Sequence, residues 1–222
     1  MKQLTLKTIA LIALSSSDRG QTLHLMDIER THISNDGIEF VIKDRIKTTR
    51  RDLKPHIVKC IKTDDPALDV CDYTLAYMNR TLTLRAKAVE DGLPKPTKLF
   101  MSWASKKPVA KNTLARWIKE VLHLSDIDIK EYKAHSTRGA SLSEAFERGA
   151  TANEIVSAGQ WSKFDTFKHF YFAPNDTSAT AKIIMDTLNE EVRSSPTKQI
   201  TCIIAYVTIY RQNSGFHTRT YH

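Results

Sequence analysis

The start of the chain constrains the fold more than any other segment. Residues 4–14 are mostly apolar, and the run ends abruptly at three serines and Asp18. A helix with apolar residues on almost every side has to be buried, so we expect a buried helix over residues 4–14. Lys2 and Lys7, followed by the apolar residues 9–14, also imitate a secretory signal. That run is short for such a signal, and we favour the buried helix.

The rest of the chain predicts a mixed fold, mainly α-helical with a small β-sheet or hairpin. Gly37 opens a β-rich region, in which residues 38–43 and 56–61 are the expected strands. Asp65 as a cap, with Pro66 at the first helical position, predicts a long helix that runs toward residue 86. Further helices are expected over residues 21–26, from residue 112 onward, and in three short segments after residue 128.

The boundaries of the three short helices follow from their capping residues. Gly149 ends the first, and Thr151 with Glu154 forms a capping box that begins the second. Ser162 is the expected cap of the third, over residues 163–172. A Ser-Ser-Pro-Thr linker then begins at residue 194. We therefore expect one compact domain over residues 1–193 and a tail, residues 194–222, for which we have no functional interpretation.

The charge of the chain favours a polyanionic partner. Its 222 residues carry a formal net charge of +8, and the pI is near 9.3. Lysines and arginines release condensed counterions when they bind phosphates, although a solubilising surface is the alternative. The three widely spaced cysteines suggest neither a disulfide framework nor a zinc site, so we expect a reducing compartment. The apolar residues 200–210 are too few to span a bilayer, and no membrane partner is expected.

The residues that bear chemistry gather between Lys133 and Tyr171. His135 and Arg138 are three residues apart at the start of an expected helix, where both can grip one phosphate. Trp161 lies 23 residues past Arg138, and Tyr171 lies 10 past Trp161. A capped helix and a turn separate them, which allows all four residues to converge on one pocket.

Each of these residues also has a purely structural interpretation. A His-x-x-Arg motif occurs by chance in many proteins, and His135 alone would be a helix cap or a core histidine. Trp161 alone would be a core aromatic residue. Tyr171 continues an apolar stripe with Phe164 and Phe167. The ordered combination, rather than any single residue, favours a functional site.

The combination resembles the C-terminal signature of the tyrosine recombinases, the phage-integrase family: His-x-x-Arg, a Gly-x-Trp or Gly-x-His turn, then Tyr. The family's first box, a buried helix that leads into an arginine, resembles TLKTIALIALSSSDRGQTLHLMDI, with Arg19 as the arginine. Its β-hairpin, which carries an active-site lysine, resembles FVIKDRIKTTRR, where we choose Lys47. The segment before the His-x-x-Arg helix resembles LFMSWASKKPVAKNTLARWIKEVL. Over residues 4–175 the chain is most similar to recombinases of Ngaro/DIRS-type retrotransposons and of cryptons.

The resemblance implies the tyrosine recombinase catalytic-domain fold and a DNA strand transferase. Tyr171 would attack a backbone phosphate and form a 3′-phosphotyrosyl bond. Arg19 and Arg138 would neutralise the non-bridging oxygens of that phosphate. His135 and Trp161 would donate hydrogen bonds to the same phosphate. Lys47 would protonate the leaving 5′-oxygen.

The resemblance also implies what the protein works with and where. Double-stranded DNA would be the substrate and partner, bound by a homo-oligomer, a tetramer in this family. No metal is expected, and no cluster of His, Cys and Asp residues has metal-ligand spacing. No nucleotide cofactor is expected, because the phosphotyrosyl bond stores the energy for religation. The eukaryotic subgroup implies a nuclear location, and otherwise the cytoplasm.

Three features depart from the family pattern. Many members have Glu or Asp three residues after the first arginine, where this chain has Thr22, with Gln21 beside it. Gln160 stands before Trp161, where Gly is commoner. The chain begins at the first catalytic box, so the family's N-terminal DNA-clamping domain is expected to be absent.

Two other function classes stay open. One keeps the fold without catalysis, as an inactive or co-opted DNA-binding remnant of a mobile element. The other is a phosphate-ester hydrolase or nuclease, which needs clustered carboxylates for metal ions. Asp64 and Asp65 are more simply explained as a helix cap.

The charge and the expected lack of a clamping domain predict weak, nonspecific DNA binding. The chain should bind duplex DNA with a Kd of about 10⁻⁴ to 10⁻⁶ M at physiological salt, and affinity should fall steeply as salt rises. Fluorescence anisotropy with two unrelated duplexes measures both properties. Nanomolar, salt-insensitive and sequence-specific binding would contradict this prediction.

Overall fold

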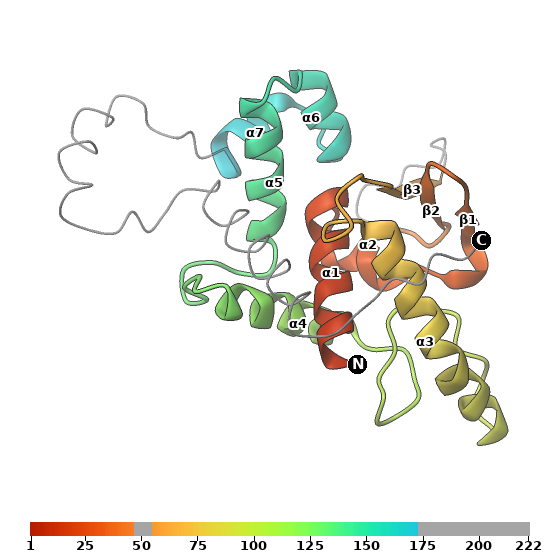
Figure 1. Ribbon diagram of the computed structural model, residues 1–222. Coiled ribbons are helices and arrows are strands. Elements are labelled where there is room, and N and C mark those ends of the chain that lie inside the picture. Colours follow the sequence, from red (N-terminus) through yellow and green to blue (C-terminus); the bar gives the residue numbers. More distant parts are fainter. Residues whose placement is uncertain (47–54, 173–222) are drawn as a thin grey trace.

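The fold is a mixed α/β arrangement of helices with a small antiparallel sheet at one side (Figure 1). A computed structural model of the chain describes residues 1–46 and 55–172. In chain order the elements are α1 (Lys2–Ser16), α2 (Gly20–Leu25), a 3₁₀ turn η1 (Ile28–Arg30), β1 (Thr31–Ile33), β2 (Gly37–Ile42), β3 (His56–Ile61), α3 (Val70–Glu90), α4 (Lys111–Leu124), α5 (Ser136–Glu147), α6 (Ala152–Ala158) and α7 (Phe164–Phe170). Among these helices, none has the length and apolar character needed to cross a membrane.

Helix α1 lies at the centre of the fold, as its sequence predicts. Residues 4–13 are all buried, and α3, α4, α5 and β3 pack around the helix. The buried polar groups have partners, because an unpaired one would be costly. The Thr8 hydroxyl donates to the carbonyl oxygen of Tyr73 at 3.2 Å, and the Lys7 ammonium donates to the Tyr73 hydroxyl at 2.8 Å. Helix α1 is therefore the scaffold on which the later elements assemble.

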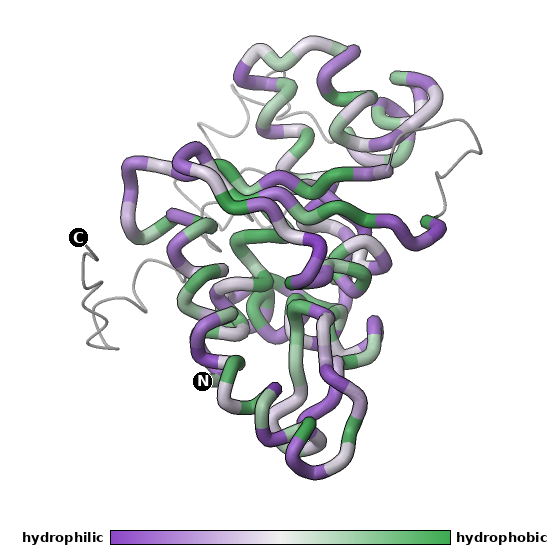
Figure 2. The backbone as a smooth tube through the Cα atoms, turned by 90° about the vertical axis from the view of Figure 1, so that its right-hand side faces the viewer, coloured by the Kyte–Doolittle hydropathy of each residue, from purple (hydrophilic) through white to green (hydrophobic). Residues whose placement is uncertain are grey.

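The sheet has the order β1-β2-β3 with antiparallel neighbours, shown side by side in Figure 2. Strands β2 and β3 confirm the two expected strands, whereas β1 was not predicted. Residues alternate between the two faces: Phe40 and Val58 pair and point into the core, while Glu39 and Lys59 pair on the outer face, where they form a 2.7 Å ion pair. His56, two residues before Val58, shares the inner face.

The start of the long helix differs most from the sequence expectation. Helix α3 begins at Val70, and its N-cap is Asp69, whose carboxylate accepts from the backbone N–H groups of Cys71 and Asp72. Asp65 instead closes a turn, accepting from the N–H of Ala67. The prediction that Asp65 caps the helix was wrong, because a second aspartate four residues on competes for the same role.

The last helix also starts one residue later than expected. Lys163, not Ser162, is the N-cap of α7, and no side chain caps this helix. The preceding helix, α6, begins with the predicted capping box, in which the Thr151 hydroxyl accepts from the N–H of Glu154 and the Glu154 carboxylate accepts from the N–H of Thr151. The proposed linker and tail, residues 194–222, lie outside the described residues.

The buried apolar side chains form two clusters. The larger one surrounds α1 and takes in the sheet, α3 and α4. The smaller one joins α5, α6 and α7 through Leu142, Ile155 and Phe167, with further aromatic rings packed around them. Helix α5 packs against α1 as well as α6, so it connects the two clusters. Arg138 lies on this connecting helix, and Trp161 and Tyr171 pack against the smaller cluster.

A buried arginine ties α3 to the segment that follows it. The guanidinium of Arg85 is 5% exposed and donates to three carbonyl oxygens at 2.7–2.9 Å, those of Pro96, Lys98 and Leu99. These bonds hold the irregular segment before Phe100 against the core.

Replacing this arginine should destabilise the fold strongly. Arg85→Met leaves three buried carbonyl groups without their donor, so we expect the free energy of unfolding to fall by about 3 kcal/mol. Lys87→Met, an exposed position on the same helix, removes the same charge and should change it by about 0.5 kcal/mol or less. Urea denaturation compares the two variants. Equal effects would show that the carbonyl contacts contribute little.

Candidate functional site

The candidate site is organised by the turn between α6 and α7, residues 159–161. Gly159 is the C-cap of α6, and its position next to Trp161 leaves no space for a side chain: a Cβ atom there would lie 2.2 Å from the indole ring. Gln160 has a φ of 48°, in the left-handed region that glycine favours. This tight turn presents a carbonyl group, an amide side chain and an indole ring within three consecutive residues.

Arg138 reaches this turn from α5. Its side chain is buried, with 4% exposed, and one Nη2–H donates to the carbonyl oxygen of Gly159. The guanidinium carbon lies 4.6 Å from the centre of the Trp161 ring and 5.6 Å from the centre of the Tyr171 ring. Arg138 is thus fixed between two aromatic faces and a backbone oxygen.

The charge of Arg138 is not fully compensated within the described residues. Burial and, to a lesser extent, the positive charge of Arg19 lower the pKa of its guanidinium to about 10, against the opposing influence of Tyr171 and Asp18. Its Nε is buried and has no hydrogen-bond partner among the described residues. A buried, underused donor with a positive charge is what an incoming anion would satisfy.

Arg19 reaches the same turn from the segment between α1 and α2. It is the N-cap residue of α2, three residues after the end of α1, and its Nη1 donates to Oε1 of Gln160 at 3.4 Å. The neighbouring Asp18 is buried and accepts from Nε2 of Gln160 at 2.7 Å and from Nε2 of His56 at 2.9 Å. These contacts join the end of α1, the start of β3 and the α6–α7 turn.

Tyr171 lies directly after α7, against α5. Its ring centre is 4.7 Å from that of Trp161, and its carbonyl oxygen accepts from the Ser143 hydroxyl at 3.2 Å. A Cβ atom at Gly139 would lie 3.5 Å from both the ring and the carbonyl oxygen of Tyr171, an ordinary contact distance, so the two segments are closely packed. The phenol oxygen makes no hydrogen bond within the part of the chain that the structure describes. The ring is therefore packed, whereas the phenol oxygen has no hydrogen-bond partner among the described residues.

The structure brings together four of the six residues selected from the sequence, namely Arg19, Arg138, Trp161 and Tyr171. His135 is the N-cap residue of α5, one turn before Arg138, and its exposed imidazole does not contact the other four. Lys47 lies outside the described residues. The structural interpretations of Trp161 and Tyr171 also hold, because both rings pack against the smaller apolar cluster.

Three residues of the site were not selected from the sequence: Asp18, His56 and Gln160. Asp18 was assigned only to the end of the first helix, and Gln160 only to a departure from the family pattern. His56 carries a usable signal, because strand alternation places it on the inner face with Val58 and Cys60, where a polar residue needs a partner. Its partner, Asp18, is 38 residues away, and no local pattern links them.

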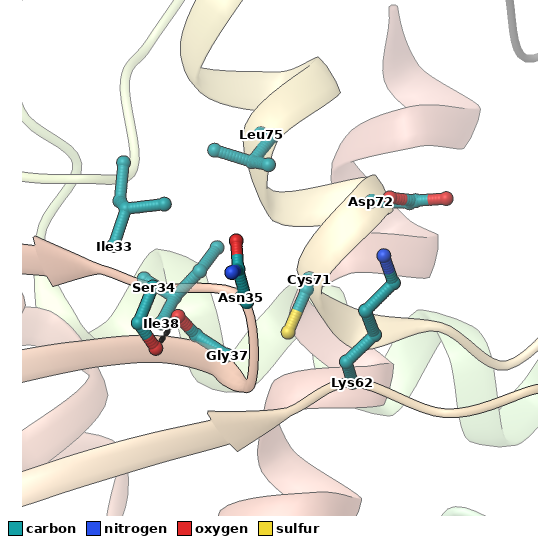
Figure 3. Close-up of a pocket in the computed structure, with 9 residues that line it drawn as sticks. All are labelled: Ile33, Ser34, Asn35, Gly37, Ile38, Lys62, Cys71, Asp72 and Leu75. Atoms are coloured by element: carbon teal, nitrogen blue, oxygen red, sulfur yellow. Dashed lines mark hydrogen bonds between the residues drawn. The ribbon is translucent and has the colours of Figure 1, made fainter. Parts of the chain in front are cut away.

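A separate pocket of about 260 Å³ lies elsewhere, at the β1–β2 turn and the start of α3 (Figure 3). Its walls include Asn35, Lys62, Cys71 and Asp72, and none of the candidate residues. Burial raises the pKa of the Cys71 thiol to about 11, which makes it a weak nucleophile at neutral pH. Among the described residues, no cluster of three or more His, Cys, Asp or Glu side chains is arranged to hold a metal ion.

Comparison with known proteins does not identify a family. No family model matches the chain, and a search among curated proteins finds no match. Any assignment of function therefore depends on the geometry of the site and on the motif resemblance. The geometry by itself describes a basic cluster suited to an oxyanion, with a tyrosine beside it.

An oxyanion should stabilise the native state through Arg138. At a sulfate concentration about tenfold above its Kd, the gain is about 1.4 kcal/mol, seen as a higher unfolding midpoint than in chloride of equal ionic strength. Arg138→Met should lose this specific gain. Arg148→Met removes an exposed charge from the end of the same helix and should retain it. Because sulfate also stabilises proteins generally, only the difference between the two variants counts, and an equal shift in both would contradict the assignment.

Proposed function

We propose that this protein cleaves and rejoins DNA strands through a covalent bond between Tyr171 and a backbone phosphate, as tyrosine recombinases do. The observation that carries the proposal is the packing of Tyr171 beside Trp161 and the buried Arg138, with Arg19 held at the same turn. A buried guanidinium group between a tryptophan and a tyrosine is poorly explained by folding alone, since burial of an under-compensated positive charge is costly.

The chemical step is an in-line displacement at phosphorus. The phenol oxygen of Tyr171 loses its proton and forms a bond to the phosphorus atom, while the bond from phosphorus to the 5′-oxygen breaks. The products are a 3′-phosphotyrosyl bond and a free 5′-hydroxyl, and the reverse step rejoins a strand. The ordinary pKa of a tyrosine is about 10, so nearby positive charge is needed to favour the phenolate.

The two arginines would act on the charge that develops in the transition state. Arg138 and Arg19 reach adjacent residues of one turn, Gly159 and Gln160, a placement suited to neutralising the two non-bridging oxygens of one phosphate. Arginine matches such oxygens with paired N–H groups, which lysine cannot do. The indole N–H of Trp161 and the imidazole of His135 would supply further donors, and Lys47 would return a proton to the leaving 5′-oxygen.

The wider setting follows from the same proposal. Double-stranded DNA is the substrate, which agrees with a net charge of +8. The protein would act as a homo-oligomer, a tetramer on DNA, in the nucleus, during site-specific recombination or integration of a mobile element. These points rest on the resemblance to the recombinases of Ngaro/DIRS-type retrotransposons and cryptons.

The competing proposal is a DNA-binding remnant without catalysis. Such a protein would keep the basic cluster and bind DNA, and the phenol of Tyr171 would have no role. Trapping of a covalent adduct distinguishes the two. A nicked substrate loses a short cleaved strand, so religation is prevented and the adduct accumulates.

The nucleophile can be tested by removing a single oxygen atom. Tyr171→Phe keeps the ring beside Trp161 and, as the phenol has no partner among the described residues, should change stability by about 0.5 kcal/mol or less. The protein–DNA adduct, measured by denaturing electrophoresis after incubation with nicked duplex, should disappear. Tyr132→Phe is the matched control, because Tyr132 packs against the larger apolar cluster, and it should still form the adduct.

The outcomes separate the proposals clearly. An adduct in the wild type and in Tyr132→Phe, but not in Tyr171→Phe, supports strand cleavage by Tyr171. An adduct that persists in Tyr171→Phe and vanishes in Tyr132→Phe would overturn the choice of nucleophile. DNA binding without an adduct in any form favours the non-catalytic remnant.

A further inference from the structure

We infer that Gln160 is a positioning residue: supported by Asp18 and His56, it holds the guanidinium of Arg19 in place to receive an oxyanion. The inference rests on the proposed function in taking this cluster as the phosphate site. It adds three residues that the motif resemblance does not assign. Gln160 acts through Arg19 and need not touch the substrate itself.

The amide of Gln160 has a single orientation that satisfies its neighbours. Its Nε2 lies 2.7 Å from Oδ1 of Asp18, and only a donor can face a carboxylate oxygen. That leaves Oε1 as an acceptor on the other side, where Nη1 of Arg19 approaches to 3.4 Å. The carboxylate of Asp18 thus decides which end of the amide faces the arginine.

His56 completes the anchor. Its Nε2 lies 2.9 Å and 3.2 Å from the two carboxylate oxygens of Asp18, so it is a donor to that group. It also lies 3.1 Å from Nε2 of Gln160. Both nitrogens donate to the same carboxylate, so they are close together without a hydrogen bond between them. With two donors from different elements, the buried Asp18 side chain is held in one position.

Arg19 needs such a hold because another positive charge is close by. The charges of Arg19 and Arg138 repel each other, and a long arginine side chain has many rotamers that lead away into solvent. The Oε1 acceptor of Gln160 offsets this tendency. Arg138 has its own acceptor in the preceding residue, Gly159, so neighbouring residues of one turn place the two guanidinium groups.

The backbone of Gln160 gives independent support. Its φ of 48° lies in the left-handed region, which is sterically unfavourable for any residue with a side chain and open to glycine. Strained positions of this kind persist where the surrounding contacts require them. Glycine would fit the turn better, so the contacts of the amide side chain explain the presence of glutamine.

The decisive variant is therefore Gln160→Gly, which relieves the backbone and removes only the side-chain contacts. We expect its affinity for inorganic sulfate, measured by NMR titration, to fall about tenfold, the size of one hydrogen bond to a charged group. The rate of adduct formation with nicked DNA should fall by a similar factor. Gln160→Met keeps the length of the side chain without its polar atoms and should lose affinity to the same extent.

A background lacking Arg19 tests whether Gln160 acts through that residue. In Arg19→Ala, adding Gln160→Gly should produce no further loss of sulfate affinity, because the two changes remove the same contact. Asp126→Gly is the control for backbone relief, since Asp126 has a φ of 56° at the end of α4. It should leave sulfate affinity unchanged.

The inference would be overturned if Gln160→Gly and Gln160→Met bound sulfate as tightly as the wild type. It would also be overturned if Gln160→Gly reduced sulfate affinity by the same factor in the Arg19→Ala background as in the wild type. The sulfate measurements decide this point without DNA chemistry. If the wild type binds sulfate in the expected manner but forms no adduct with nicked DNA, the proposed function fails and the positioning role of Gln160 stands.

Discussion

The arrangement of the site depends on the burial of one guanidinium group. Arg138 sits between the rings of Trp161 and Tyr171 with a hydrogen bond to the carbonyl oxygen of Gly159. Each of these partners belongs to the α6–α7 turn or to the residue after α7. The charge thereby determines where the last described helices lie against α5. Packing of this kind is preorganised: the positive group is desolvated before any ligand arrives, and its interaction with an anion is stronger than it would be in water.

The site also lies where two separately packed parts of the molecule meet. Asp18 and Arg19 follow the helix at the centre of the larger apolar cluster, whereas Trp161 and Tyr171 belong to the smaller one. Helix α5 connects the two clusters, and so do the polar contacts of Gln160 with Asp18 and Arg19. A small shift of α6 and α7 relative to α1 would separate Arg19 from Arg138. The spacing of the two guanidinium groups is therefore coupled to the packing between the two clusters.

The sequence predicted those features that local patterns determine. The buried first helix, strands β2 and β3 and the Thr151 capping box follow from periodicity and capping chemistry. The start of α3 was wrong because Asp65 and Asp69 both suit an N-cap, and only the folded chain distinguishes them. Strand β1 has three residues, one of them half-buried and two exposed; its place comes from backbone pairing with β2. Arg19 and Arg138 could be paired through the motif order, but the link from Asp18 to His56 and Gln160 depends on tertiary packing across 38 and 142 residues.

The central position of α1 has a consequence for how the protein is made. The helix is made before α5, which helps to cover it and ends at Glu147. At about 5–20 residues per second, roughly 7–30 s pass between the synthesis of these two segments. During that interval the apolar surface of α1 that α5 covers in the folded protein stays exposed. The nascent helix is then a natural client for chaperones that shield apolar segments at the ribosomal exit.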